Sequence, residues 1–207
     1  MDALHTPENQ LIALLVAATL LICTLVGVWR VYRRRRARSR LNAAVTSVGL
    51  DALQEVLVPD GMGGSLHVDF LLLTTRCVLV VDLRDVAGNI FGGDQMTEWT
   101  VMAGAKRSTF HNPQGAMYDR IAVVKQLSGE LPVEGRLLFT RRGKFPKGLP
   151  RWTMMVESLR TEFPPADAQS REVLMNRYRE TWDSIRSQVT PSPLKKSVPF
   201  LREVFLE

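Results

Sequence analysis

The stretch from His67 to Asp85, HVDFLLLTTRCVLVVDLRD, predicts the centre of the fold and raises its main chemical question. Two apolar runs rich in valine and leucine flank the polar residues TTR, and each run has the length of one strand. Because nearly every position in both runs is apolar, we expect an antiparallel strand pair that other elements cover on both faces. The same pair carries two carboxylates, Asp69 and Asp82, and burying an anion costs several kcal/mol unless a partner compensates it.

A tight turn is expected at residues 75–76, and it would set the register of this strand pair. Counting back from the turn along both strands puts Asp69 opposite Asp82 and His67 opposite Arg84. Directly opposite side chains point to the same face, with Cβ atoms about 4.5–5.5 Å apart. Alternation along a strand also puts Arg84 on the face of Asp82. We therefore expect these four groups to converge at the open end of the hairpin.

Two interpretations of this cluster stay open from the sequence. In the first, Arg84 neutralises one carboxylate in a charge-assisted pair and His67 hydrogen-bonds the other. In the second, Asp69 and Asp82 bind a divalent cation, Mg²⁺ or Mn²⁺, whose other ligands are waters and substrate phosphate oxygens, as phosphodiester cleavage requires. The spacing of the residues does not choose between the two.

The rest of the chain beyond residue 41 alternates strand and helix signals. Asn112 and Pro113 predict a helix start, because an asparagine side chain caps free amides and proline suits the first helical position. This alternation around an antiparallel hairpin predicts a mixed α/β domain. The expected elements are a short helix at 41–49, strands at 53–59 and 133–140, a small hairpin at 88–102, a helix at 113–128, a short strand at 152–159 and a last helix from about 163 to 189.

The N-terminal region predicts a membrane anchor. LIALLVAATLLICTLVGVW, Leu11–Trp29, has 19 residues without charge or proline. As a helix it would measure about 28 Å, close to the thickness of a bilayer core. A removable secretory signal carries its positive charge before the apolar run, whereas here seven arginines follow it, between Arg30 and Arg40. Arginines on this side predict that residues 1–10 lie outside and the rest of the chain lies in the cytoplasm.

The positive charge is unevenly spread along the chain. The chain has 27 basic and 21 acidic residues, but 7 of the basic ones lie between Arg30 and Arg40, and residues 41–207 are close to neutral. Bulk charge therefore does not predict nucleic-acid binding by the folded part, although a local patch remains open. The basic loop RRGKFPKG at 141–148 suits contact with phosphates or with anionic lipid. Cys23 and Cys77 lie in different elements and are expected to stay reduced.

In order and spacing, these residues resemble the nuclease-related domain, the NERD family. The resemblance rests on Asp69, an acid 13 residues later, a cation two residues after that, then GNIFG, a tryptophan and the NP helix start. It covers residues 50–127 and more weakly the strand GRLLFT. It implies a restriction-endonuclease-like mixed sheet flanked by helices, and a bacterial protein. It also implies that Asp69 and Asp82 would be metal ligands, with Arg84 in the place of the lysine that positions or activates the attacking water.

Several positions depart from the family pattern. Asp82 is one methylene shorter than the usual glutamate, and Arg84 stays protonated, so it cannot act as a base. No acid occurs in residues 41–50, and the usual helix glutamine falls on Ala116, two places after Gln114. These departures favour a degenerate module that binds or scaffolds. The alternative function is an active Mg²⁺- or Mn²⁺-dependent nuclease that cleaves DNA or RNA.

The expected organisation is a single-pass protein of a bacterial inner membrane, with its N-terminus outside. Its expected partners are the bilayer, anionic lipid headgroups at Arg30–Arg40, and nucleic acid. The expected segments are an outer tail at 1–10, a transmembrane helix at 11–29, an arginine-rich segment at 30–40, a NERD-like domain at 41–160, a helix packed on that domain at 161–190, and a tail at 191–207.

Overall fold

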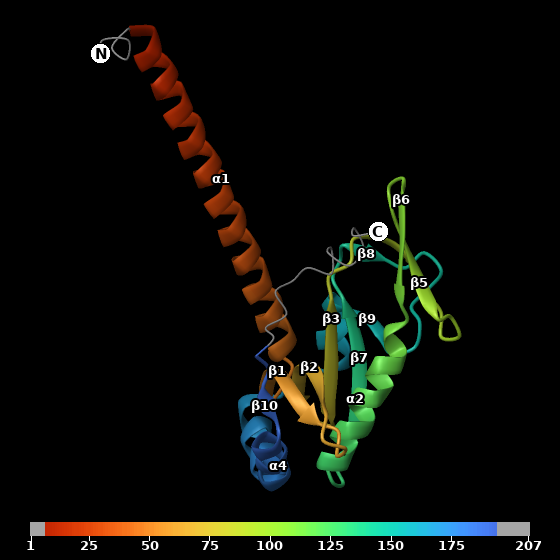
Figure 1. The fold of residues 1–207 in the computed structure, drawn as a ribbon. Helices are drawn as coiled ribbons and strands as arrows, with labels where there is room; N and C mark the ends of the chain where they lie inside the picture. Colours follow the sequence, from red (N-terminus) through yellow and green to blue (C-terminus); the bar gives the residue numbers. More distant parts are fainter. Residues whose placement is uncertain (1–6, 194–207) are drawn as a thin grey trace. The chain divides into compact units, whose positions relative to one another are not determined.

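The structure, a computed structural model, describes residues 7–193 and divides into two compact units, Met1–Ala43 and Ala44–Glu207. The described part of the first unit is helical and belongs to α1, Pro7–Thr46, which runs as one helix through the apolar and arginine-rich segments (Figure 1). Apolar side chains along it are exposed, as Leu20 (61%) and Leu25 (59%) show. Of the helices in the described part, α1 alone is long and apolar enough to cross a membrane, with a mean hydropathy of 1.9 over an 18-residue window.

The second unit is built on a six-stranded mixed sheet, as predicted. The strand order is β10-β1-β2-β3-β7-β9. The pairs β10–β1, β1–β2 and β2–β3 are antiparallel, whereas β3–β7 and β7–β9 are parallel. The strands are β1 Asp51–Pro59, β2 Ser65–Leu73, β3 Val78–Arg84, β7 Val133–Phe139, β9 Thr153–Met155 and β10 Thr190–Pro191.

The predicted register of the central hairpin is confirmed. β2 and β3 pair from Leu73↔Val78 to Phe70↔Val81, which is the register counted from the turn. The regular ladder ends there, one residue before Asp69 and Asp82. The two aspartates are therefore the first residues beyond the last ladder pair, one on each strand, and their side chains take other partners.

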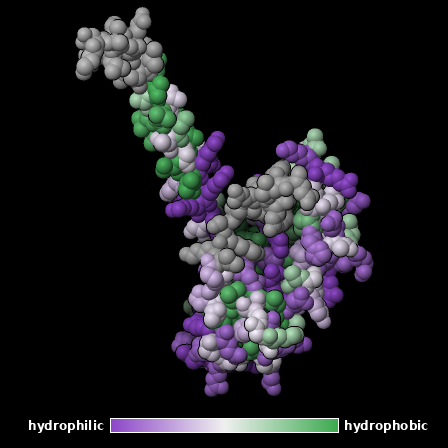
Figure 2. Space-filling model, in the orientation of Figure 1, coloured by the Kyte–Doolittle hydropathy of each residue, from purple (hydrophilic) through white to green (hydrophobic). Residues whose placement is uncertain are grey.

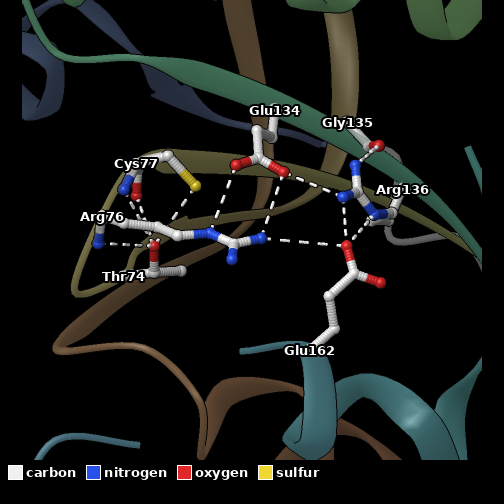
Figure 3. A network of polar contacts seen from close by, with 7 residues as sticks. All are labelled: Thr74, Arg76, Cys77, Glu134, Gly135, Arg136 and Glu162. Carbon is white, nitrogen blue, oxygen red and sulfur yellow. Dashed lines mark hydrogen bonds and ion pairs between the residues drawn. The ribbon is translucent and has the colours of Figure 1, made fainter. Parts of the chain in front are cut away.

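The hairpin turn is tied to the neighbouring strand by a polar network (Figure 3). The Thr74 hydroxyl donates to the Cys77 carbonyl at 2.7 Å and accepts the Cys77 amide at 3.1 Å. Arg76 reaches Glu134 of β7 at 3.3 Å and lies 3.8 Å from Glu162. Cys77 is buried, as expected for a reduced cysteine of the core, and the desolvation raises the pKa of its thiol.

Helices cover both faces of the sheet. On one face, Met117 and Val124 of α2 (Pro113–Leu127) and Trp182 of α4 (Ala168–Gln188) belong to the larger apolar cluster. On the other, Val45 and Phe163 pack with the hairpin residues of a second cluster, next to η1 (Val156–Ser158) and α3 (Leu159–Glu162). The predicted burial of the hairpin on both faces is thus confirmed.

The predicted helix boundaries at α2 are also confirmed. The Asn112 side chain accepts a hydrogen bond from the backbone amide of Gln114 at 3.0 Å, and Pro113 occupies the first turn. Gly129, with φ of 57°, follows the C-cap Ser128 in the left-handed conformation that glycine adopts most easily. By contrast, the short helix expected at 41–49 is not separate, because its residues up to Thr46 continue α1.

A second, four-stranded sheet has the order β6-β5-β4-β8. The predicted hairpin at 88–102 corresponds to β4 (Gly88–Phe91) and β5 (Glu98–Ala103), while β6 (Lys106–His111) and β8 (Gly143–Lys144) extend it on either side. Trp99 fastens this sheet to the first one, because its ring lies 5.8 Å from that of Phe110 and 6.2 Å from that of Phe139 on β7.

The segment expected as a tail from residue 191 begins as a strand. Pro191 of β10 pairs with Val56 of β1, and the Ser192 amide donates to the Glu55 carbonyl at 2.7 Å. The rest of the expected tail, residues 194–207, lies outside the described residues. The end of α4 is therefore joined directly to the edge of the large sheet.

Candidate functional site

Three acidic side chains form a row across the first three strands. Glu55 lies between the paired residues Gln54 and Val56 of β1, which puts it level with Asp69 of β2. Asp82 comes next in line when the register of β2 and β3 is continued one residue past its last pair, Phe70↔Val81. Asp69 is 5% exposed and Asp82 is 1% exposed. Carboxylates this deeply buried need compensating donors, and the structure supplies them in two separate groups.

The first group surrounds Asp82. Its Oδ2 atom accepts from Arg84 at 2.7 Å and lies 3.3 Å from a guanidinium nitrogen of Arg120 on α2. Arg120 also donates from Nε to the His67 carbonyl at 2.6 Å, which fixes α2 to β2. Two positive charges thus face one carboxylate in a part of the molecule that water barely reaches, where ion pairs are strong.

The second group surrounds Asp69. Its Oδ2 atom accepts the backbone amide of Leu83 at 2.9 Å. Its Oδ1 atom lies 3.1 Å from Nε2 of His67, and the same nitrogen lies 3.2 Å from Oε2 of Glu55. The other ring nitrogen of His67 lies 3.2 Å from the Ser192 hydroxyl. The imidazole is therefore held between two carboxylates and a hydroxyl.

The predicted convergence of four groups is thus resolved into two pairs. Arg84 turns to Asp82, and His67 turns to Asp69 and to Glu55, instead of His67 facing Arg84 as the register had indicated. The physical reason is that regular pairing stops at Phe70 and Val81, so the strands no longer impose opposition on the residues beyond. This arrangement corresponds to the first of the two interpretations of the sequence.

Glu55 has a strained backbone in the middle of a strand. Its φ of 50° is left-handed, which costs a non-glycine residue about 1–3 kcal/mol and recurs at functional sites. The amide of Ser192, the residue after β10, donates a hydrogen bond to the Glu55 carbonyl. The neighbouring residues Gln54 and Val56 keep their partners in β2, so the distortion is local to the position that meets His67.

The two groups differ in how well they would suit a cation. Glu55, His67 and Asp69 each offer a ligand atom within 4.8 Å of the other two. Imidazole with carboxylates suits a transition ion better than Mg²⁺. At the predicted Asp69 and Asp82 pair, by contrast, an ion would meet the two guanidinium groups already at Asp82.

Sequence reasoning missed Glu55, Arg120 and Ser192. Arg120 carried a signal, since it stands beside Ile121 within the apolar stripe of α2, where a cation needs a buried partner. Glu55 carried a weaker one, as an acid in a strand next to the hairpin. Ser192 carried none, because only the pairing of β10 brings it to His67.

Gln114, which stands near the position of the family's helix glutamine, has a structural role here. Its side-chain amide donates to the Asp94 carboxylate at 2.7 Å and to the Arg151 carbonyl at 2.8 Å. The hydrogen bond from Gln114 is the largest cause of the lowered pKa of Asp94, and the hydrogen bond from the Arg151 amide is the second. Gln114 therefore ties two loops to the start of α2.

Comparison with known proteins agrees with this architecture. The model of the nuclease-related domain matches residues 32–140, which is just over half of the chain. The chain belongs to the NERD family. An uncharacterized protein of Bacillus anthracis is similar, with 24% identity over 120 residues that cover 58% of this chain and 57% of that protein. The chain thus spans little more than half the length of this relative, and no solved structure matches it.

Proposed function

We propose that this NERD protein is a membrane-anchored module that acts by binding and not by cleaving phosphodiester bonds. The observation that carries the proposal is the environment of Asp82, whose carboxylate faces both Arg84 and Arg120. In the family's mode of action this position would be a metal ligand. A guanidinium also stays protonated at all working pH values, so Arg84 cannot take a proton from water.

The anchor in this proposal is α1. Its exposed apolar residues and the arginines that follow them suit a bilayer core and its cytoplasmic surface, respectively. Figure 2 shows the corresponding change along the helix from hydrophobic to hydrophilic surface. We propose that the chain is a single-pass membrane protein with its N-terminus outside and its α/β domain in the cytoplasm, next to anionic headgroups.

A cleavage assay tests the proposal. The full-length protein in detergent is incubated with labelled single- and double-stranded DNA and RNA, in Mg²⁺, in Mn²⁺ and in EDTA. We expect no metal-dependent cleavage above the level of the Asp69→Asn variant prepared in the same way. Cleavage that requires a metal and disappears in Asp69→Asn would show that the site is catalytic.

A second function, metal-dependent hydrolysis, is favoured by one specific observation, the trio of Glu55, His67 and Asp69. These three residues would hold the ion, and a bound Mn²⁺ would polarise a phosphate oxygen and lower the pKa of a bound water. The chain's own contribution would be to fix the ligands, with Ser192 orienting the His67 ring and Leu83 orienting Asp69.

Thermal unfolding separates this candidate from the pair predicted from the sequence. If the trio binds Mn²⁺, the ion raises the melting temperature of the wild type and of Asp82→Asn, but not of His67→Ala. If Asp69 and Asp82 are the ligands, the shift disappears in Asp82→Asn instead. An unchanged melting temperature in the wild type would exclude both sites as Mn²⁺ sites at the concentration used.

A further inference from the structure

Positive charge is concentrated on the second sheet and its loops. Residues 41–207 are close to neutral, but residues 86–112 and 140–151 carry seven basic side chains against the acids Asp94 and Glu98. Both segments contribute strands to the four-stranded sheet. The remainder of the domain is correspondingly acidic. Even when Asp85 and Glu157 are counted, which pair with two of these cations, the second sheet and its loops keep an excess of three positive charges, the sign that attracts a polyanion. The seven basic residues are Lys106, Arg107, Arg141, Arg142, Lys144, Lys147 and Arg151.

One face of the second sheet is open to solvent. The register places Arg107 of β6, Met102 of β5, Asn89 of β4 and Lys144 of β8 in a single row across the four strands. Arg107, Asn89 and Lys144 are exposed and Met102 is half-buried. Residues that alternate with them, such as Trp99, are buried against the core. The row therefore presents a cation at each end of the face and an amide between them.

The next row on the same face supplies hydroxyl groups and a ring. Thr109, Thr100 and Phe91 are aligned across β6, β5 and β4. Phe91 is half-buried, and the Lys147 ammonium lies 5.9 Å from the centre of its ring. An aromatic ring on an open sheet face beside cations is the arrangement on which unpaired bases stack. Hydrophilic residues dominate the visible surface over β5 and β6 (Figure 2).

The cations of this face differ in their partners. Within residues 7–193, no ion pair engages the side chains of Arg107, Lys144 or Lys147. In the neighbouring loop, Arg141 pairs with Glu157 at 3.0 Å and Arg142 pairs with Asp85 at 2.7 Å. The charge directed to solvent therefore comes mainly from the sheet face itself and from Lys147, which lies over Phe91.

We propose that the open face of the four-stranded sheet, made of Asn89, Phe91, Thr100, Arg107 and Lys144, binds single-stranded nucleic acid. The proposal rests on the proposed function, because it says what the binding module binds. The cations would contact phosphates, the ring would stack on a base, and the amide and hydroxyls would bond base edges. A duplex hides its base faces, and a lipid surface would make little use of hydroxyl and amide groups, so both fit this face less well.

A binding measurement in EDTA tests this face without any cleavage. The full-length protein in detergent is titrated into a fluorescent oligonucleotide of about 20 nucleotides, and anisotropy is followed at several salt concentrations. We expect Lys144→Glu to weaken binding about tenfold and to lower the salt slope by about one. Arg179→Glu on α4 is the matched control, because this arginine is also exposed and the charge change is identical. The arginines after the membrane helix contribute equally to every variant.

The stacking role has its own pair of variants. Phe91→Ala should weaken the single-stranded complex about 5- to 100-fold, whereas Phe91→Trp should keep it. The affinity for a duplex of equal length should not change in Phe91→Ala. Equal weakening by Lys144→Glu and Arg179→Glu, or an unchanged affinity in Phe91→Ala, would overturn the proposal.

Two further outcomes keep this proposal separate from others. If Lys144→Glu lowers the affinity of the detergent-solubilised protein for micelles that contain phosphatidylserine but leaves oligonucleotide affinity unchanged, the face is a lipid surface and the proposal fails. If instead the protein cleaves nucleic acid in Mn²⁺ but binds through this face in EDTA, the non-catalytic function fails and the binding face stands.

Discussion

Asp82 is almost fully buried, and its charge is balanced by arginines from two different elements. We expect Arg120→Met to lower the free energy of unfolding by about 2–3 kcal/mol, since it removes one charged hydrogen bond to a buried carboxylate and leaves Arg84 in place. Methionine keeps most of the apolar stem of the side chain, so the loss reports the charge. Urea unfolding monitored by circular dichroism measures it.

A double-mutant cycle with Asp82→Asn checks that the loss arises at this contact. If Arg120 acts through Asp82, the cost of Arg120→Met should fall by about 0.5–3 kcal/mol in the Asp82→Asn background. Additive costs would mean that the hydrogen bond from Arg120 to the His67 carbonyl accounts for the effect instead.

Gln114 and Asp94 give a prediction that concerns pH. The pKa of Asp94 is lowered in the folded protein, first by the hydrogen bond from Gln114. A carboxyl group with a lowered folded pKa contributes stability above its unfolded pKa, and loses that contribution as pH falls through the folded pKa. We therefore expect Gln114→Leu to raise the pKa of Asp94 toward its ordinary value of 3.8. The free energy of unfolding should then change less as the pH falls from the unfolded pKa through the folded pKa of this group.

Carboxyl-detected NMR titration measures this change residue by residue. Asp167 is an internal control, because its pKa is lowered by hydrogen bonds from Ser170 at the start of α4, independently of Gln114. A shift of both aspartates in Gln114→Leu would point to a general loss of structure. An unmoved Asp94 would show that the Arg151 amide alone accounts for its lowered pKa.

The contact between the two sheets depends on a glycine. A Cβ atom at Gly92 would lie 2.4 Å from the Trp99 ring, which is fully buried and packs against Phe110 and Phe139. We expect Gly92→Ala to cost about 1–3 kcal/mol, because the ring has no free space to move into. Gly93→Ala is the matched control, since its Cβ would lie 3.4 Å from the nearest atom, Met96 Sδ. Thermal unfolding of the two variants compares them, and equal losses would contradict the role of Trp99.

The elements of the fold were largely predictable where the sequence carries local signals. The hairpin register followed from the turn, and α2 followed from Asn112 and Pro113. The strand β10 was not predictable, because it has two residues, one of which is a proline, and its partner β1 lies far away in sequence. For the same reason the sequence could bring Asp69 and Asp82 to the open end of one hairpin, but could not bring Ser192 to His67. Arg120 lies at the site because α2 packs on the sheet. The spacing of residues within one strand pair carries no information about that packing.

The arrangement of the whole chain across a membrane depends on the arginines that follow the apolar segment. We expect the α/β domain to lie in the cytoplasm, so that a C-terminal alkaline phosphatase fusion is inactive in bacterial cells and a fluorescent-protein fusion is bright. Replacing the run Arg33–Arg36 by asparagine should move a measurable fraction of the chains to the opposite orientation, because the excess of positive charge near the helix end sets the topology. The ratio of the two reporter activities measures this fraction.

The control for that experiment replaces Arg177 and Arg179 of α4 by asparagine. These exposed arginines lie far along the chain from the apolar segment, so their loss should leave the reporter ratio unchanged. If the wild-type phosphatase fusion is active, the domain lies outside, and a cytoplasmic nucleic acid could no longer be its ligand. Orientation thus decides which polyanions can reach the open face of the second sheet, and the topology measurement bears on the binding proposal as well as on the anchor.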